Sequence, residues 1–120
     1  MLNKIYKSIV CHPELRNKFK TKSTIDSTDC INEAILLAKS LGVCVEFSKI
    51  FKIDRPNNST LFSNGQIEII NNKIEELKID LLIVDGKLSP IQQRNLEKSL
   101  EVKVIDRTRL ILDIFEKRAA

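Results

Sequence analysis

The feature that most limits the fold of this chain is the repeated alternation of short apolar runs with segments of helical period. The runs are rich in β-branched and aromatic residues, as strands are, and cover residues 4–11, 43–53, 80–85 and 102–107. The run DLLIVD at 80–85 is wholly apolar between its aspartates, which is typical of a strand covered on both faces. The pattern predicts an α/β fold: a single three-layer domain with about four mostly parallel strands and helices on both faces.

Each predicted strand is followed by apolar residues at helical spacing, the first of them after a long polar connection. The first helix begins near Thr28 and closes at Gly42, which suits a C-cap. Its apolar stripe consists of Ile31, Ala34, Ile35, Ala38 and Leu41. The second helix follows a turn-rich loop at 54–65 and has Asn64 as its expected cap. Its stripe consists of Ile67, Ile70, Ile74 and Leu77.

The third helix begins in the stretch LSPIQQRNLEK. Ser89 suits the N-cap, Pro90 the first helical position, and Gln92 the reciprocal position of a capping box. The residues expected to point into the core are Ile91, Leu96 and Leu100. A last helix begins near residues 106–108, carries Leu110, Ile111, Ile114 and Phe115, and meets no stop signal, so we expect the chain to be a fragment of something longer.

Length and composition indicate one globular domain. The chain has 120 residues, of which 42% are hydrophobic and 30% charged, which is unlike a disordered or fibrous chain. No window reaches the roughly 18 consecutive apolar residues of a membrane span, and the polar start lacks the apolar core of a signal peptide. These features predict a cytoplasmic protein.

The positive charge of the chain is concentrated at its amino end. Residues 1–22 carry a net charge of +5, whereas the other residues are nearly balanced. We therefore divide the chain into a basic amino-terminal strand and connection (1–22), an α/β core (23–107) and the start of the last helix (108–120). The basic segment is equally compatible with nucleic-acid binding and with a solvated terminus.

The residue types that carry catalysis or bind metals are scarce. The three cysteines, Cys11, Cys30 and Cys44, form no metal-binding pattern, and we expect buried, reduced thiols. The only histidine, His12, follows Cys11, but a buried thiol beside a loop histidine is favoured over a catalytic dyad. Aspartates that flank the strands are more often turn formers and helix caps than magnesium ligands; they are Asp80, Asp85 and Asp106. No catalytic centre, metal site or cofactor is predicted in this chain.

A nucleotide site is one alternative for function. In open parallel sheets, ligands bind at the carboxyl ends of the strands. The candidates there are Arg55 and Gly65 in the loop at 54–65, and Asp85 after the third strand. The chain contains neither of the common glycine-rich phosphate-binding motifs, so an ordinary helix start is favoured over a phosphate site.

A second alternative is an RNA contact on the third helix. Planar amide and guanidinium groups hydrogen-bond phosphate, the 2′-hydroxyl and base edges. The outward residues proposed for such a contact are Gln93, Arg94, Asn95 and Lys98. An ordinary solvated face is the competing interpretation.

The stretch LSPIQQRNLEK, followed by VKVIDRTRLILDIFEKRA, closely resembles the amino-terminal region of the HflX family of translational GTPases. The likeness is close over residues 81–119 and looser back to residue 33. It implies an α/β domain that precedes a helical hairpin and a GTPase domain, so the helix at 108–120 is expected to run into the missing helical hairpin and the absent GTPase domain. It also implies binding to the large ribosomal subunit and its rRNA. In some members of the family this binding serves to split stalled ribosomes under stress. Arg107 and Arg109 are then expected phosphate partners.

The same resemblance limits what this chain itself is expected to bind. GTP and magnesium belong to the absent GTPase domain, which is also an expected partner in cis. An adenine nucleotide is proposed for this domain in some family members. Of the glycine-rich set that accompanies it, this chain keeps only Gly65, with Ser63 and Gln66 where glycine and lysine are usual.

Overall fold

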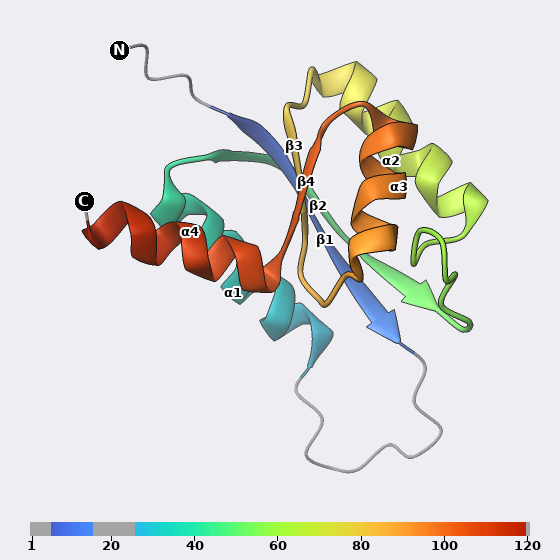
Figure 1. Cartoon of the computed structure of the whole chain (residues 1–120), viewed down its shortest axis with the longest axis horizontal. Coiled ribbons are helices and arrows are strands. Elements are labelled where there is room, and N and C mark those ends of the chain that lie inside the picture. Colours follow the sequence, from blue (N-terminus) through green and yellow to red (C-terminus); the bar gives the residue numbers. More distant parts are fainter. Residues whose placement is uncertain (1–5, 16–25, 120) are drawn as a thin grey trace.

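Four strands alternate with four helices along the chain, as the sequence pattern predicts (Figure 1). The computed structural model describes residues 6–15 and 26–119. In chain order the elements are β1 (Lys7–Leu15), α1 (Ser27–Leu41), β2 (Cys44–Ile53), α2 (Asn64–Leu77), β3 (Leu81–Val84), α3 (Pro90–Leu100), β4 (Lys103–Asp106) and α4 (Arg107–Ala119).

All neighbouring strands are parallel, and their order in the sheet is β2-β1-β3-β4. The chain leaves β1 towards β2 and later returns to the other side of β1, where β3 and then β4 are added. Such an order places α1 on one face and α2 and α3 on the other, because parallel crossovers are right-handed. Figure 1 shows this arrangement, with α4 beside α1, so the predicted three-layer α/β domain is confirmed.

Each face of the sheet has its own apolar core because alternate strand residues point to opposite faces. Ile9 of β1 lies in the cluster under α2 and α3, whereas Val10 lies in the cluster under α1 and α4. All four residues of β3 are buried, two in each cluster. The apolar run DLLIVD is therefore a strand covered on both faces, as predicted.

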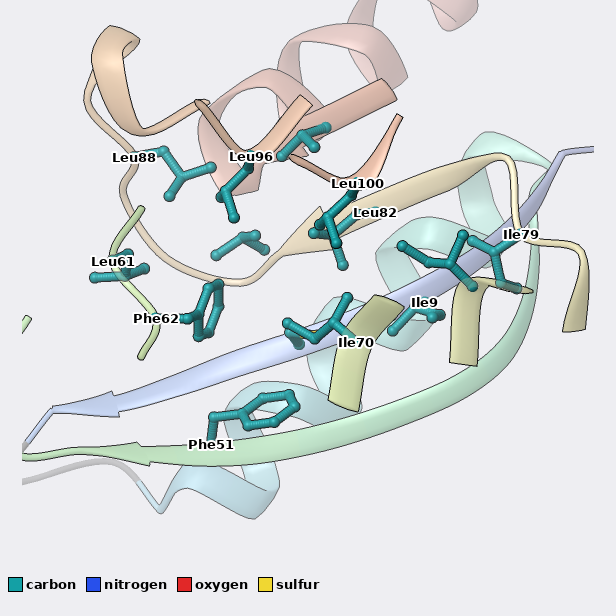
Figure 2. Close-up of a cluster of buried hydrophobic side chains, with 14 of the residues drawn as sticks. Ile9, Phe51, Leu61, Phe62, Ile70, Ile79, Leu82, Leu88, Leu96 and Leu100 are labelled. Atoms are coloured by element: carbon teal, nitrogen blue, oxygen red, sulfur yellow. The ribbon is translucent and has the colours of Figure 1, made fainter. Parts of the chain in front are cut away.

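The core under α2 and α3 contains the largest fully buried side chain, Phe62, which no pattern singled out. Its ring meets that of Phe51 edge to face, with centroids 5.6 Å apart, and Ile70 and Leu96 lie in the same cluster (Figure 2). The turn-rich loop at 54–63 therefore ends in residues that belong to the core.

Strand β1 is longer than predicted, since His12 to Leu15 form strand where a polar connection was expected. The partner strand explains the difference, because β2 has ten residues and pairs with β1 as far as Leu15. Proline is tolerated at Pro13 because the pairing of β1 with β3 stops at Cys11, so the edge that lacks an N–H has no strand partner. Gly86 packs there instead, and a Cβ on it would lie 2.9 Å from Pro13 Cγ.

The start of α2 also differs from the prediction. Ser63, not Asn64, is the N-cap: its backbone is extended and its Oγ accepts from the Gln66 N–H. Asn64 is already helical, which excludes it as the cap. The predicted αL C-cap at Gly42 is confirmed, with φ of 96°.

One further expectation, on the cysteines, needs correction, and one exposed aromatic residue stands out. Among the thiols, Cys11 is buried but Cys44 is exposed at the start of β2, so the expectation that all are buried is wrong; all three are free. On α4, Leu110 and Ile114 are buried, whereas Phe115 is 66% exposed because it lies one helical step beyond the inward stripe.

The predicted basic amino-terminal segment lies mostly outside the described residues, as do its boundary at residue 22 and the start of the strand predicted at 4–11. None of the helices that the structure describes is long and apolar enough to cross a membrane.

Replacing Phe62 tests the role of the core under α2 and α3. Phe62→Ala is expected to lower the free energy of unfolding by about 3–5 kcal/mol, because it removes a fully buried ring and leaves a cavity against Phe51. Phe115→Ala removes the same atoms from an exposed site and is expected to change stability by less than about 0.5 kcal/mol. Urea denaturation followed by circular dichroism measures both, and equal losses would contradict this assignment of the core.

Candidate functional site

Helix α3 begins as the sequence predicts. Ser89 is the N-cap with an extended backbone, and Pro90 is the first helical residue. The Ser89 Oγ accepts from the Gln92 N–H at 3.1 Å, and the Gln92 side-chain oxygen accepts from the Ser89 N–H at 3.0 Å. The capping box is therefore present in both directions, and it satisfies donors that would otherwise be open to an anion.

Amide side chains of α3 also hold the loop that precedes α2. Gln92 Nε2 donates to the Asn57 carbonyl and Asn95 Nδ2 to the Ser59 carbonyl, each at 3.0 Å. The loop closes on itself through two backbone hydrogen bonds between Asn57 and Leu61. Leu61, buried with a φ of 72°, turns the chain into the core. The loop and the helix therefore form one fixed surface.

Gln93 makes a contact with the edge of the sheet. Its Nε2 donates to the Val104 carbonyl at 3.1 Å, while Glu97 Oε2 accepts from the Val104 N–H at 3.2 Å. Three of the amides that the sequence made conspicuous, those of Gln92, Gln93 and Asn95, thus bind this chain's own backbone. Their partners lie at least 11 residues away in sequence, which is why the sequence gave no signal of the contacts.

The outward face of α3 carries two cations beside an exposed aliphatic side chain. Arg94 and Lys98 are exposed, and neither side chain forms a hydrogen bond or ion pair with another described residue. The prediction that Ile91 points inward is wrong, since 65% of it is exposed. Ile91 and Leu96 are five positions apart in sequence, which places their side chains roughly 140° apart around the helix. Ile91, Arg94 and Lys98 instead form one stripe, called here the α3 stripe.

The two other arginines expected to meet phosphate lie on the opposite face of the sheet, at the start of α4. Arg109 Nε donates to Asp113 at 2.8 Å. Arg107 donates to Asp85 at 2.8 Å and to Glu33 at 2.7 Å, and its hydrogen bond to Asp85 is the main cause of its raised pKa. The structure therefore does not bring Arg107 and Arg109 together with Arg94.

Asp85 is the centre of a buried polar cluster at the carboxyl edge of β1 and β3, where the strand order reverses. Its side chain is 1% exposed; Oδ1 accepts from Arg107 and Oδ2 lies 2.9 Å from His12 Nδ1. We call His12, Asp85, Arg107 and Glu33 the Asp85 cluster. Both oxygens of the buried carboxylate thus have a partner, as burial of a charge requires.

The nucleotide candidates are not gathered around this cluster. Arg55 and Gly65 are exposed, in the loop after β2 and in the first turn of α2, on the other side of the sheet from the helices that contribute to the Asp85 cluster. The hydrogen-bonding partners of Asp85 come from β1 and α4 and, through its backbone N–H, from Cys11. A nucleotide would therefore have to displace existing contacts to use Asp85.

The geometry does not support a cysteine–histidine dyad or a metal centre. Cys11 and His12 are adjacent in a strand, so their side chains point to opposite faces. Burial raises the pKa of the Cys11 thiol, and the positive charge of Lys49 opposes this only in part. Asp106 is a helix cap, accepting from the Arg109 N–H at 3.0 Å. Among residues 6–15 and 26–119 no group of three or more metal-ligating side chains is gathered.

Replacing Arg107 tests the Asp85 cluster. Arg107→Ala is expected to lower the free energy of unfolding by about 1–3 kcal/mol, because it leaves Asp85 buried with one charged donor fewer. Arg109→Ala breaks an exposed ion pair within α4 and is expected to cost less than about 1 kcal/mol. Chemical denaturation measures both, and an Arg109 loss as large as that of Arg107 would contradict the special role of the buried carboxylate.

Comparison with known proteins relates the chain to the N-terminal regions of GTPases. The family model for the N-terminal region of GTP-binding GTPases matches residues 28–116. The GTPase HflX of Magnetococcus marinus is 43% identical over 89 residues, covering 74% of this chain and 21% of the relative. That of Spirochaeta thermophila is 34% identical over 98 residues, covering 82% of this chain and 24% of the relative. The chain thus spans about a fifth of the length of these curated relatives.

Solved structures share the fold. A GTP-binding protein from the archaeon Sulfolobus solfataricus, in complex with GDP, superimposes with a TM-score of 0.64 at 22% identity, over 91% of this chain and 30% of that one. A complex of SsGBP with GDP gives a TM-score of 0.65 at 23% identity, over 92% of this chain and 29% of that one. The family model and the HflX relatives confirm the resemblance seen in LSPIQQRNLEK, and the chain belongs to the family of N-terminal domains of HflX GTPases.

Proposed function

We propose that this chain is the part of an HflX-type GTP-binding protein that binds the large ribosomal subunit, and that it contacts rRNA through the α3 stripe. The observation that carries the proposal is the exposure of Arg94 and Lys98 on one face of α3, without partners among the described residues. A ribosomal partner also implies a cytoplasmic location.

The chemistry of the stripe suits RNA. The guanidinium of Arg94 presents five donors in a planar fork that matches phosphate and base edges, and Lys98 adds a point charge one turn further on. Ile91 lies at the start of the same stripe and offers apolar surface to a ribose or a base face. Cationic groups beside a small apolar surface are what an exposed, irregular RNA segment requires.

The surface is also held in place before binding. Gln92 and Asn95 tie α3 to the loop at Asn57 and Ser59, and Gln93 ties it to β4. A surface already ordered loses less conformational entropy when it binds. Within the predicted set we therefore assign Arg94 and Lys98 to rRNA contact, and Gln93 and Asn95 to positioning the helix that carries them.

Arg107 and Arg109 are less available to rRNA than Arg94. Both are already paired with carboxylates of this chain, so a phosphate would have to compete with Asp85 and Glu33 or with Asp113. We expect their contribution to rRNA binding to be smaller than that of Arg94.

Ribosome splitting and GTP hydrolysis are proposed only for the whole protein. The relatives named GTPase HflX are about five times as long as the matched segment. GTP and magnesium would bind the GTPase domain in cis, since these 120 residues contain no phosphate-binding loop motif. This assignment keeps the amino-terminal domain as the RNA-facing part.

Charge reversal on α3 tests the RNA contact. Arg94→Glu is expected to weaken co-sedimentation with purified large ribosomal subunits by about tenfold or more, because a phosphate contact is lost and a repulsion added. Raising the salt concentration should also weaken co-sedimentation of the wild-type chain with large subunits. Arg118→Glu makes the same charge change on exposed α4 and is expected to leave pelleting nearly unchanged. Equal pelleting of wild type and Arg94→Glu would refute the assignment of Arg94.

A thermal-shift measurement tests the nucleotide alternative. We expect no increase in Tm when GTP or ATP is added with magnesium to the 120-residue chain, because Asp85 is occupied and Arg55 and Gly65 lie elsewhere. A ligand at 100 times its Kd would stabilise the folded chain by about 2.7 kcal/mol, which such an assay detects. A saturable increase that Gly65→Ala removes would establish a nucleotide site at the start of α2.

A further inference from the structure

The two edge strands of the sheet, β4 and β2, differ in whether their outward backbone groups are already hydrogen-bonded. On the outer edge of β4, the Val104 N–H donates to Glu97 and its carbonyl accepts from Gln93, so both outward backbone groups are occupied by α3. That edge is short and cannot pair with another strand without losing these bonds. The edge of β2 has no comparable cover among the residues that the structure describes.

Strand β2 presents a row of open backbone groups. It has ten residues and pairs only with β1 in the described sheet. Backbone groups of successive strand residues point to opposite edges, and the Lys52 carbonyl points away from β1, where it accepts from Gln66 Nε2 at 2.8 Å. Ile50 and Ser48 point the same way, and no side chain of the described residues bonds to their outward N–H and C=O groups. These are the groups that an added strand would pair with.

A hollow lies beside the same edge. It measures about 390 Å³ and is lined by Ile35 and Lys39 of α1 and by Val45, Glu46, Phe47 and Ser48 of β2. Ile35 and Val45 contribute apolar surface from the α1 side of the sheet, while Phe47 packs on the α2 side. The side chains on one face of an added strand would therefore meet apolar surface beside α1.

The charge along this edge selects the kind of strand. Four lysines lie along it: Lys39 at the hollow, Lys49 with its Nζ 5.7 Å from the centre of the Phe51 ring, exposed Lys52, and Lys73 with its Nζ 5.0 Å from the centre of the Phe47 ring. Carboxylates near the edge include those of Glu46, of Glu76, which pairs with Lys73 at 3.5 Å, and of Asp54, which directly follows β2. The four lysines outnumber these carboxylates, which favours carboxylates on the partner.

The same lysines argue against a second copy of this chain. If two β2 strands paired antiparallel about a two-fold axis, the lysine-rich edges of both copies would meet, and like charges brought close together destabilise a strand pair. Lysine on an open edge is a known device against self-association. It does not protect against a strand of opposite charge.

We propose that the free edge of β2 binds an extended acidic peptide segment of another protein by strand addition. The segment pairs its backbone with Ser48 and Ile50 and alternates apolar and acidic side chains. The apolar side chains lie on the α1 face, against Ile35 and Val45, and the carboxylates lie on the α2 face, near Lys49 and Lys73. The site is separate from the α3 stripe and does not depend on the proposed RNA contact.

The test uses a capped seven-residue peptide of alternating valine and glutamate, titrated into the isotopically labelled 120-residue chain and followed by amide chemical shifts. We expect saturable shifts at the amides of β2 around Ser48 and Ile50, and none at β4. The affinity should fall by about tenfold or more with the fully N-methylated peptide, which keeps the charges but has no N–H donors, and with a valine–lysine peptide.

Variants of the protein complete the test. Ser48→Pro removes one outward donor from an edge position where proline is tolerated and is expected to weaken binding by about tenfold, whereas Ser48→Ala should bind like wild type. Lys49→Glu with Lys73→Glu should weaken binding to a similar extent. If Ser48→Pro does not fold, the N-methylated peptide on the wild-type chain decides the question.

Three outcomes would overturn the proposal. The first is equal binding of the unmethylated and N-methylated peptides. The second is concentration-dependent dimerisation through β2 in the absence of peptide, which would make the edge an interface between copies. The third is an oligouridylate that shifts the β2 amides when the acidic peptide does not, which would make the edge a nucleic-acid surface.

Discussion

The buried carboxylate of Asp85 is the constraint on which the carboxyl edge of this sheet depends. A carboxylate that is only 1% exposed needs a polar partner for each oxygen. His12 of β1 and Arg107 of α4 are these partners. Arg107 extends the connection to Glu33 of α1. The Asp85 cluster therefore ties two strands to both helices of one face at the point where the strand order reverses. In many open sheets this position binds a ligand; here the chain's own side chains occupy it.

This occupancy explains why both proposed surfaces lie away from the usual place. When the switch point and the helix N-termini are filled by internal contacts, the groups left to meet a partner are those on outer helix faces and open strand edges. The capping boxes at Ser63 and Ser89 act in the same way as the Asp85 cluster, because each satisfies donors that would otherwise attract an anion.

Sequence reasoning succeeded where the determining interactions are local. Strand and helix order, the capping box of Ser89 and Gln92, and the αL glycine at 42 follow from residues a few positions apart. It failed where a distant segment decides: the length of β1 is set by β2, and Phe62 is buried because the loop folds back onto Phe51. Ile91 is a different case, because its spacing from Leu96 already contradicted an inward position. The amides of α3 could not be sorted from sequence, since their partners are backbone carbonyls elsewhere in the chain.

The arrangement of the two proposed surfaces follows from the strand order β2-β1-β3-β4. Helix α3 covers β4 at one edge of the sheet and uses Gln93 and Glu97 to close it, so its remaining cations face outward. Strand β2 forms the opposite edge, separated from β4 by β1 and β3. An RNA bound to the α3 stripe and a peptide added to β2 would therefore occupy separate ends of one rigid sheet. Because neither needs the other's residues, the two can bind together, and any coupling between them would have to pass through β1 and the Asp85 cluster.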